Sequence, residues 1–527
     1  MSLTRRDIIK AGVFAGATLS LPLSRVVSGQ SALDNRMPAS KLPKPFTTSF
    51  VRPPVAVPVR SDETTDYYTL HMMPTYSEIV PGYQTLLFGY EGSVPGPTIK
   101  VNRGRKAVVR HCNTLPTSHP TYGYEPWTSV HLHGSASLPQ FDGYASDLTR
   151  PNQFKDYQYP NFQPARTLWY HDHGLHHTAE NVWHGLAGQY HMFDPLEQSL
   201  PIPHGDYDVP LIISDALFNN DGSLLFTLED DSGLWGDVIL VNGRPWPVMQ
   251  VERRKYRFRI LGAAISRSWN FSLDSGEPMA VIATDGGLMP APQFVRSFRA
   301  ASSERYEVII DFSKYPIGKR VVLQNRSNKN NRDYTNTNKI MAFDVVGEAT
   351  DLSNNEIPAV LNPNDTTMAL QASQAVRTRK FTFEREHGEW TINGHTWKDV
   401  ERSNYTFTLA SPKRGDVEIW EFRNTSGGWF HPVHVHLIDF KILDRNGRPP
   451  SPHELGPKDV VYVGENEIVR VIAKFEGRGK YMIHCHNLIH EDHDMMGQFE
   501  VIDPAYPGDD PLGWGPRSMD EEANFPL

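Results

Sequence analysis

The segment YMIHCHNLIHEDHDMMG, Tyr481–Gly497, guides the interpretation of the whole chain. In it Cys485 lies between two histidines and is followed by His490 and then by Met495. A thiolate, imidazoles and a weak thioether are the ligands of a blue-copper site. Successive side chains of a β-strand point to opposite faces, so the two neighbouring histidines should face one way and Cys485 the other. One strand can therefore serve two metal sites.

Three further histidine motifs repeat this theme. They are His131-Leu132-His133, His171-Asp172-His173 and His431-Pro432-Val433-His434-Val435-His436. Each carries an H-x-H pair, whose imidazoles share one face of a strand. A single pair is weak evidence, since many such histidines are surface or core residues. With His484 and His486 the four pairs supply eight imidazoles for a polynuclear site, and the nearby cysteine and methionine select copper among the metals that imidazole binds.

Composition limits the alternatives. A chain of 527 residues has room for about three domains of roughly 150 residues each. Its many short Val, Ile, Tyr and Phe runs, separated by some of its 41 Pro and 39 Gly, favour strands and turns over helices. A net charge of −9 makes nucleic acid an improbable partner. There are two cysteines, so a disulfide framework is not expected, and Cys112 is predicted to be a small buried residue of a strand.

Residues 1–29 are predicted to be an export signal. Arg5 and Arg6 precede the apolar run Ala11–Leu23, which resembles a bacterial twin-arginine signal. An ordinary secretory signal is the alternative. We expect a periplasmic or secreted protein, and no later stretch is apolar for long enough to predict a membrane span.

The remainder divides into an extended lead-in, three domains, a linker and a tail. The expected ranges are 30–63, 64–204, 205–347 and 377–503, with the linker at 348–376 and a surface tail at 504–527. RGDVEIWEFRNT (Arg414–Thr425) echoes the strand that ends at Asn113-Thr114, and VNGRPWP (Val241–Pro247) echoes INGHTW (Ile392–Trp397). Such echoes suggest one β-sandwich unit used repeatedly. In the middle domain Lys255–Leu261 and Arg305–Phe312 are the strongest predicted strands.

The four motifs resemble the signature of the multicopper oxidases. PGPTI (Pro95–Ile99), WYHDHG (Trp169–Gly174) and ERYEVIIDFS (Glu304–Ser313) extend the resemblance over nearly the whole chain. Within the family, Gly427–Leu443 and His484–Met496 resemble bilirubin oxidases most and spore-coat laccases next. The resemblance implies an all-β fold of three consecutive cupredoxin-like Greek-key β-sandwich domains holding four copper ions.

The resemblance also implies the ligands. Type 1 copper would take His431, Cys485, His490 and axial Met495; type 2 copper would take His131 and His434; the type 3 pair would take His133, His171, His173, His436, His484 and His486. An axial Met should give a modest type 1 potential. Electrons would enter through an exposed edge of His431 or His490 and pass from Cys485 towards the three-copper site, where O2 is reduced to water.

Three further residues match family positions with roles near copper. Asp142 and Glu491 are candidates for proton delivery, and the alternative for each is a hydrogen bond that orients an imidazole. Trp429 could line the donor site or be a core aromatic residue.

The predicted function is oxidation of phenolic or tetrapyrrole, bilirubin-like, donors with O2 by a monomer. A metallo-oxidase acting on Cu(I), Fe(II) or Mn(II) is the alternative, and it usually shows a Met-rich insertion or an acidic patch near type 1 copper. The 14 methionines are dispersed, which argues against Cu(I). A third possibility, an electron carrier with one copper, leaves the eight paired imidazoles unexplained.

Overall fold

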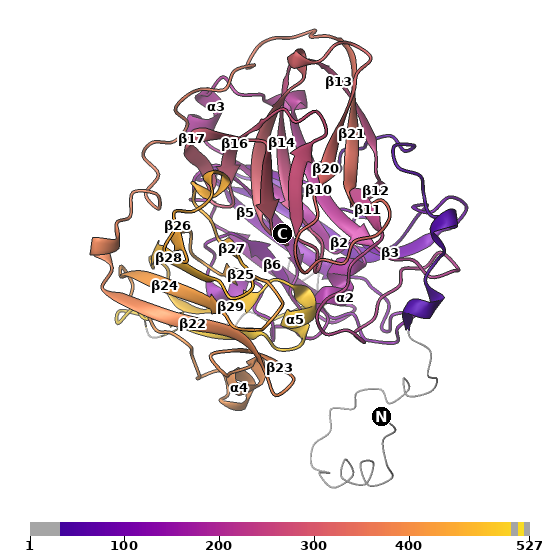
Figure 1. The fold of residues 1–527 in the computed structure, drawn as a ribbon. Helices are drawn as coiled ribbons and strands as arrows, with labels where there is room; N and C mark the ends of the chain where they lie inside the picture. The colour runs from indigo at the N-terminus through magenta and orange to yellow at the C-terminus, as the bar shows by residue number, and fades with distance from the viewer. Residues whose placement is uncertain (1–31, 507, 509–514, 521–527) are drawn as a thin grey trace.

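Three β-sandwiches, each of two sheets, follow one another along the chain (Figure 1). The structure is a computed structural model that describes residues 32–506, 508 and 515–520, so the expected export signal lies outside it. The architecture confirms the all-β prediction. Helices are short, and none in the described ranges has the length and apolar content needed to span a membrane. They are α2 (Thr178–Trp183), α3 (Pro195–Ser199), α4 (Trp397–Arg402) and α5 (Leu488–Asp492), with 3-10 turns at Ala32–Asn35, Ala39–Lys41, Pro139–Phe141, Gly205–Tyr207, Phe312–Lys314, Ala372–Gln374 and Pro452–Glu454.

The first sandwich positions two of the histidine motifs. Its first sheet contains β1 (Arg60–Ser61), β2 (Thr65–Ser77), β3 (Thr85–Tyr90), β5 (Lys106–Asn113), β7 (Gln153–Tyr159) and β31 (Arg517–Ser518), and its second contains β4 (Ile99–Asn102), β6 (Val130–His133), β8 (Arg166–Asp172) and β9 (Ala187–Phe193). β5 pairs in parallel with β2, and Cys112 on β5 is fully buried, as predicted. β6 pairs with β8 so that His131 lies opposite His171.

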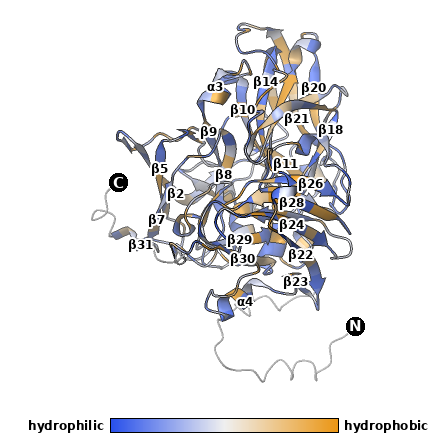
Figure 2. Ribbon diagram, turned by 90° about the vertical axis from the view of Figure 1, so that its left-hand side faces the viewer, coloured by the Kyte–Doolittle hydropathy of each residue, from blue (hydrophilic) through white to orange (hydrophobic). Residues whose placement is uncertain are grey.

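The second sandwich contains the largest apolar core. Its sheets are β10 (Asp208–Ala216), β11 (Val238–Val241), β12 (Arg244–Pro245), β14 (Lys255–Gly262), β16 (Met279–Thr284), β17 (Gly287–Val295) and β19 (Arg305–Asp311), facing β13 (Val248–Arg253), β15 (Trp269–Leu273), β18 (Ser297–Ala300), β20 (Arg320–Asn325) and β21 (Lys339–Glu348). The two strongest predicted strands are β14 and β19, which pair antiparallel. Figure 2 shows hydrophobic residues along β14, while hydrophilic residues dominate the rim of the molecule.

The third sandwich positions the other two motifs. It consists of β22 (Arg377–Glu386), β23 (Glu389–Ile392), β24 (Val417–Asn424), β26 (Phe440–Arg445) and β28 (Ile468–Lys474), facing β25 (His431–Val435), β27 (Val460–Val463), β29 (Gly479–Cys485) and β30 (Met496–Val501). β24 pairs in parallel with β22, as β5 does with β2. β25 pairs with β29, which sets His434 opposite His484. The same backbone pairing therefore recurs in the two segments that echo each other in sequence.

Both Asn-Gly echoes are tight turns. Asn242 and Gly243 connect β11 to β12, and Asn393 and Gly394 follow β23, with φ angles of 50° and 77° in the first turn and 56° and 75° in the second. A two-residue turn with positive φ at both positions suits the right-handed twist of paired strands, and Asn-Gly adopts it readily.

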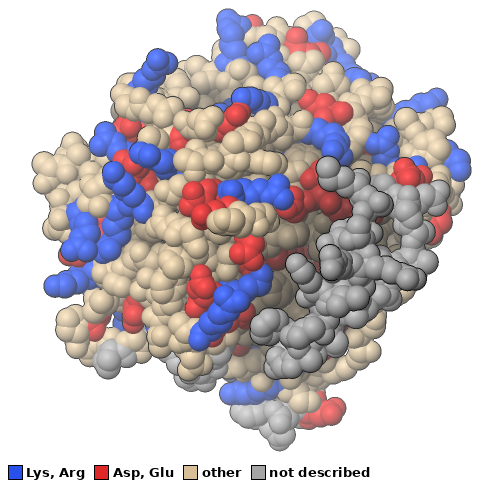
Figure 3. Space-filling model, turned by 60° about the horizontal axis from the view of Figure 1, so that its bottom comes forward, with Lys and Arg blue, Asp and Glu red and all other residues tan. Residues whose placement is uncertain are grey.

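The segments outside the sandwiches join them together. In the lead-in, Met37 is fully buried in the second core, and Ser49 bridges to Val248. The linker contains one 3-10 turn, and β31 of the tail pairs with β7. β9 ends at Phe193 and β10 begins at Asp208, while the borders drawn from the sequence stay predictions. On the face in Figure 3, acidic and basic side chains are interspersed.

Candidate metal centre

A small cluster joins three residues of the third domain. His431 Nδ1 lies 3.3 Å from Cys485 Sγ, His490 Nδ1 lies 3.5 Å from the same sulfur, and the two nitrogens are 3.3 Å apart. A trigonal ion with bonds of about 2.0 Å has ligand atoms about 3.5 Å apart, so one ion fits at the centre of this triangle. All three side chains are fully buried. Their geometry matches a His2Cys site.

Met495 is brought to the same cluster by the loop. Its main-chain oxygen accepts a hydrogen bond from the Cys485 amide (3.1 Å), and its own amide donates to the His490 carbonyl (3.0 Å). The side chain is fully buried in the same apolar core as Cys485. The loop from β29 through α5 thus holds the thiolate, one imidazole and the thioether close together.

Both imidazoles of this cluster are covered, so the expectation of an exposed ring edge is wrong. His490 Nε2 lies 3.1 Å from the carbonyl of Ser232, in a loop of the second domain, and His431 Nε2 lies 2.5 Å from Ser426 Oγ. The sequence alone does not show that the loop containing Ser232 lies over His490. Neither ring can be touched directly by a molecule from solution.

Two tryptophans lead from the cluster towards the surface. Trp390, fully buried, stacks on His490 with ring centres 3.9 Å apart, and Trp429, half-buried, meets Trp390 edge-on at 5.2 Å. The Arg385 guanidinium lies over both indoles and forms an ion pair with Asp231. Trp429 is therefore both a packing residue and the outer member of this aromatic pair.

The eight paired histidines converge between the first and third domains. They form three overlapping groups: His131, His133 and His434; His133, His171 and His486; and His173, His436 and His484. The Nε2 atoms of His131 and His434 are 3.4 Å apart, and His484 Nε2 lies 3.2 Å from the Nε2 atoms of both other members of its group. Strand alternation explains why Cys485 belongs to the other cluster.

In several of these histidines a hydrogen bond made by Nδ1 orients the other ring nitrogen, Nε2, towards the centre of the cluster. His131 Nδ1 lies 2.5 Å from the Asp142 carbonyl, His434 Nδ1 2.8 Å from the Asp459 carbonyl, and His171 Nδ1 2.7 Å from the carbonyl of the next residue. A ring whose Nδ1–H donates to a carbonyl has its Nε2 lone pair free for a metal.

Metal ions fit this cluster. His133 Nδ1, His171 Nε2 and both ring nitrogens of His486 are buried without a hydrogen-bond partner. Buried unpaired polar atoms are costly, and metal ions at the centre would satisfy them. Burial lowers the pKa of His171 to about 3 and that of His173 to about 4, which keeps both rings neutral, as metal ligands must be.

The two predicted carboxylates each contact the histidine cluster. Asp142 Oδ2 lies 2.7 Å from His436 Nδ1, and Glu491 Oε2 lies 2.9 Å from His484 Nδ1. Burial raises the pKa of Asp142 well above its usual range. Burial also acts to raise the pKa of Glu491, but His484 and His173 outweigh it and lower that pKa to about 2. One carboxyl thus favours its protonated form and the other its charged form.

Sequence reasoning missed several residues that support the ligands. Asp459 contacts two imidazoles, Ser426 and Trp390 cover the small cluster, and the Asn487 amide donates to Cys485 Sγ at 3.4 Å. Asn487, two residues after Cys485, could have been found from its position. The others lie far from any ligand motif in sequence or carry no motif of their own.

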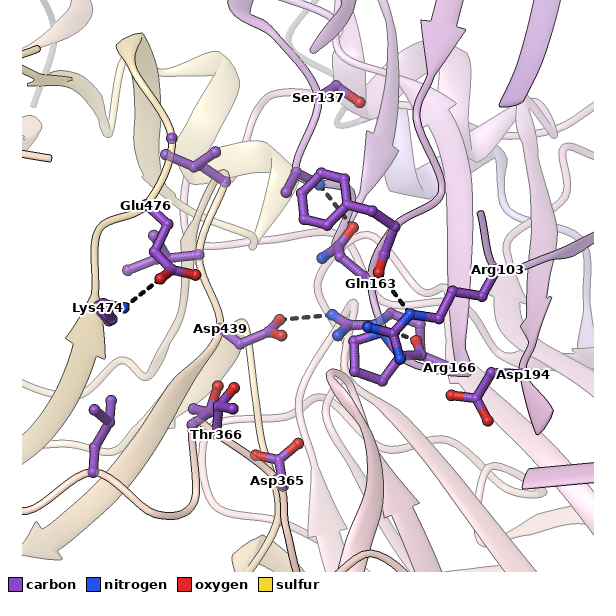
Figure 4. A pocket seen from close by; sticks show the side chains of 18 of the residues that line it. Arg103, Ser137, Gln163, Arg166, Asp194, Asp365, Thr366, Asp439, Lys474 and Glu476 are labelled. Atoms are coloured by element: carbon purple, nitrogen blue, oxygen red, sulfur yellow. Dashed lines mark hydrogen bonds and ion pairs between the residues drawn. The ribbon is translucent and has the colours of Figure 1, made fainter. Parts of the chain in front are cut away.

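A cavity of about 1420 Å3 lies between the first and third domains (Figure 4). Its walls include Ala136–Leu138, shortly after the His133 motif, and Leu437–Asp439, directly after His436. Arg166 and Asp439 point towards each other across its wall and form an ion pair of 2.8 Å. The lining thus includes residues that follow two of the histidine motifs but none of the histidines themselves.

Three sandwiches with a His2Cys cluster linked to a polyhistidine cluster define a multicopper oxidase. Family models described as multicopper oxidase match residues 74–196, 183–345 and 370–505. The chain belongs to this family of copper oxidoreductases that use O2, and its domains are cupredoxin-like, as predicted.

Individual relatives agree. Bilirubin oxidase of Albifimbria verrucaria is 43% identical over 458 residues, which cover 82% of this chain and 76% of the relative. A Bacillus subtilis laccase is 33% identical over 519 residues, covering 87% and 99%. The crystal structure of a multi-copper oxidase from Pediococcus acidilactici superposes with a TM-score of 0.79 at 30% identity, covering 89% and 94%. The resemblance to bilirubin oxidases and laccases is confirmed.

Proposed function

We propose that this protein couples one-electron oxidation of phenolic or tetrapyrrole donors to four-electron reduction of O2 to water. The observation that carries the proposal is the adjacency of His484, Cys485 and His486. Cys485 belongs to the small cluster, whereas its two neighbours, His484 and His486, belong to two different groups of the histidine cluster. The peptide bonds of three successive residues therefore link an electron-entry site to a site with room for several ions.

Four copper ions would be held as the sequence predicts. The small cluster with Met495 would hold type 1 copper, His131 and His434 type 2, and the remaining six histidines the type 3 pair. Copper supplies one-electron transfer at the first site and O2 reduction at the second when bound. The buried side chains exclude water, and neutral imidazoles together with a thiol are the ligands that suit copper. Burial raises the pKa of the Cys485 thiol, so this thiol releases its proton on binding the ion.

Protons would reach the histidine cluster through its two carboxylates. The Oε2 atom of Glu491, which can accept a proton, lies 2.9 Å from His484 Nδ1. Its Oε1 atom lies 3.5 Å from His173 Nδ1. Asp142, whose Oδ2 faces His436 Nδ1, favours the protonated form and can supply a proton from Oδ1, which has no hydrogen-bond partner and lies 3.5 Å from His131 Nδ1. The cavity between the domains offers the approach for O2 and water.

Donors would dock over Trp429. The rings of His431 and His490 are covered, so an aromatic donor would approach through the tryptophan pair, whose half-buried outer member is Trp429. Indole faces suit flat aromatic donors such as phenols and pyrroles. The names of the relatives, bilirubin oxidase and laccase, agree with this donor class.

A metallo-oxidase remains the second candidate because of one observation. Glu229, Asp230 and Asp231 precede Ser232, which covers His490, and so place an acidic segment beside the small cluster. However, Asp231 forms an ion pair with Arg385, and Asp230 lies 3.5 Å from the guanidinium of Arg332. Paired carboxylates attract a metal cation less, so we favour organic donors.

Steady-state kinetics with bilirubin, a dimethoxyphenol, Cu(I) and Fe(II) test the substrate class. We expect the highest kcat/KM with an organic donor. Asp231→Asn is the informative variant: it should leave phenol oxidation within a few-fold of wild type, and it should lower Fe(II) oxidation if the acidic segment docks metal. A metal ion as the best substrate of the wild-type protein would overturn the proposal.

Export and the monomeric state also remain proposals. Mass spectrometry of the protein recovered from the cell exterior or periplasm should show cleavage near Ser28 and Gly29. Light scattering should give the mass of one chain.

A further inference from the structure

We propose that Arg305 of the second domain is a positioning residue for the histidine cluster, although this domain supplies none of the proposed ligands. Arg305 would act through Asp459 of the third domain, which touches His133 and His434. The inference rests on the proposed function, because it assumes that those histidines hold copper. It assigns the second domain a direct part in building the copper site.

Asp459 connects two histidine motifs that are far apart in sequence. Its Oδ1 lies 3.0 Å from His133 Nε2, and its main-chain oxygen lies 2.8 Å from His434 Nδ1. His133 thereby directs Nδ1, which has no hydrogen-bond partner, towards the cluster. One residue thus sets the ring orientation of one imidazole from each of two motifs.

Arg305 fixes the carboxylate of Asp459 with both ends of its guanidinium. Nη1 donates to Oδ1 at 2.7 Å, and Nη2 donates to Oδ2. Nε donates to the Thr167 carbonyl of the first domain at 3.0 Å. Arg305 and Asp459 are both almost completely buried. A bidentate Arg–carboxylate pair adds geometric specificity as well as energy, and Arg305 here ties all three domains together.

The turn between β16 and β17 holds the same segment by its backbone. The Gly286 amide donates to the Pro457 carbonyl at 2.7 Å, and Asp285 Oδ2 accepts from the amides of Asp459 and Val460 at 3.2 Å each. Asp285 Oδ1 also accepts from the Arg305 amide at 2.7 Å. The Asp459 carboxylate, the Arg305 guanidinium and the main chain around Asp459 are therefore held in fixed positions relative to one another without a metal.

Lys458 carries the second positive charge of the network. Its ammonium lies 2.8 Å from Asp285 and 2.9 Å from Glu304, and it shares Asp285 with Arg305, whose Nη1 lies 3.6 Å from Asp285 Oδ1. Arg305 is left as the cation that lies on the side chain of Asp459. Without it, a buried carboxylate beside His133 would lose its two charge-assisted hydrogen bonds and its fixed orientation.

Copper retention tests the proposal on the full-length, copper-loaded protein. Arg305→Gln removes the charge and the fork, and Arg305→Lys keeps the charge alone. Samples are equilibrated with increasing chelator, and the type 2 EPR signal, total copper and the blue type 1 absorption are followed. Losing a partner behind a metal ligand lowers affinity by about 10–100-fold, so half-loss of copper from the histidine cluster, measured as total copper less the blue type 1 ion, should need about 10–100-fold less free chelator. The blue absorption should persist.

Arg257→Lys is the matched control. Arg257 is equally buried in the second domain, but its side chain pairs with Glu197 and Glu307. We expect this control to keep the wild-type chelator midpoint even if its melting temperature falls. An effect on folding alone would move the type 1 and type 2 midpoints together in both substitutions.

Each outcome of the chelator titration either supports or overturns the positioning role of Arg305. Wild-type midpoints for the copper of the histidine cluster in both Arg305→Lys and Arg305→Gln would overturn the positioning role. If Arg305→Gln does not fold, Arg305→Lys decides, because loss of the fork alone should still lower the midpoint. A wild-type protein that shows no type 2 signal would instead refute the proposed function, so the two failures are distinguishable.

Discussion

Replacing Cys485 with serine should separate the two copper sites. The sulfur lies 3.3 Å and 3.5 Å from the ligand nitrogens of His431 and His490, and it is the soft ligand of the group. A hydroxyl is a poor ligand for copper here, and losing a direct ligand should cost more than the about 10–100-fold affinity loss of an outer partner. The variant should therefore lose the blue absorption and one of the proposed copper ions.

Folding should survive this substitution. The new hydroxyl replaces a fully buried sulfur that accepts a hydrogen bond from the Asn487 amide, and a hydroxyl can accept the same bond. Its O–H faces the imidazole nitrogens of His431 and His490, so the cost is that of burying a more polar group, about 1–3 kcal/mol, which lowers the melting temperature of the copper-free protein by a few degrees. Cys112→Ser is the matched control, since Cys112 is equally buried in β5 but lies outside both clusters. It should show a similar thermal shift and keep its blue absorption.

Three measurements check the prediction: copper content, the visible spectrum and O2 uptake with a phenolic donor. O2 uptake should fall to background in Cys485→Ser while the type 2 EPR signal remains. Turnover with O2 at a wild-type rate in a protein that lacks the blue absorption would refute the link through His484, Cys485 and His486.

Other consequences follow from single contacts. Trp390→Phe keeps the stack on the copper ligand but removes the indole N–H bond to the Asp231 carbonyl, so kcat/KM for phenols should fall about fivefold with copper content unchanged, as steady-state assays would show. Glu491→Gln should slow O2 reduction by about 10²–10⁴-fold if the carboxylate moves protons, whereas copper loss without slower turnover per copper would indicate an orienting role. Burial acts to raise the pKa of Glu454, yet Arg445 outweighs it and lowers the pKa to about 2. Its stabilisation is therefore complete above a pH of about 4.5 and lost as pH falls towards 2, and Glu454→Gln should flatten that loss in urea unfolding; an unchanged slope would contradict it.

The twelve proposed ligands could be read from the sequence because each motif is local. Strand alternation places the imidazoles of an H-x-H pair on one face and sends Cys485 to the other. The ordering of His490 and Met495 after Cys485 likewise depends on a single loop. Two strong strands of the middle domain and the buried position of Cys112 were also predictable, since short runs rich in β-branched and aromatic residues predict strands.

Only the tertiary structure decided how those ligands are enclosed. Ser232 reaches His490 from another domain, and Arg305 reaches His133 through Asp459. These contacts join residues more than 100 positions apart, and no periodicity or motif encodes such pairs. The sequence by itself determined the ligand chemistry and the strands that carry it, because both depend on near neighbours. Burial of the electron-entry site and the support of the histidine cluster depend on how three sandwiches pack, which only the folded chain specifies.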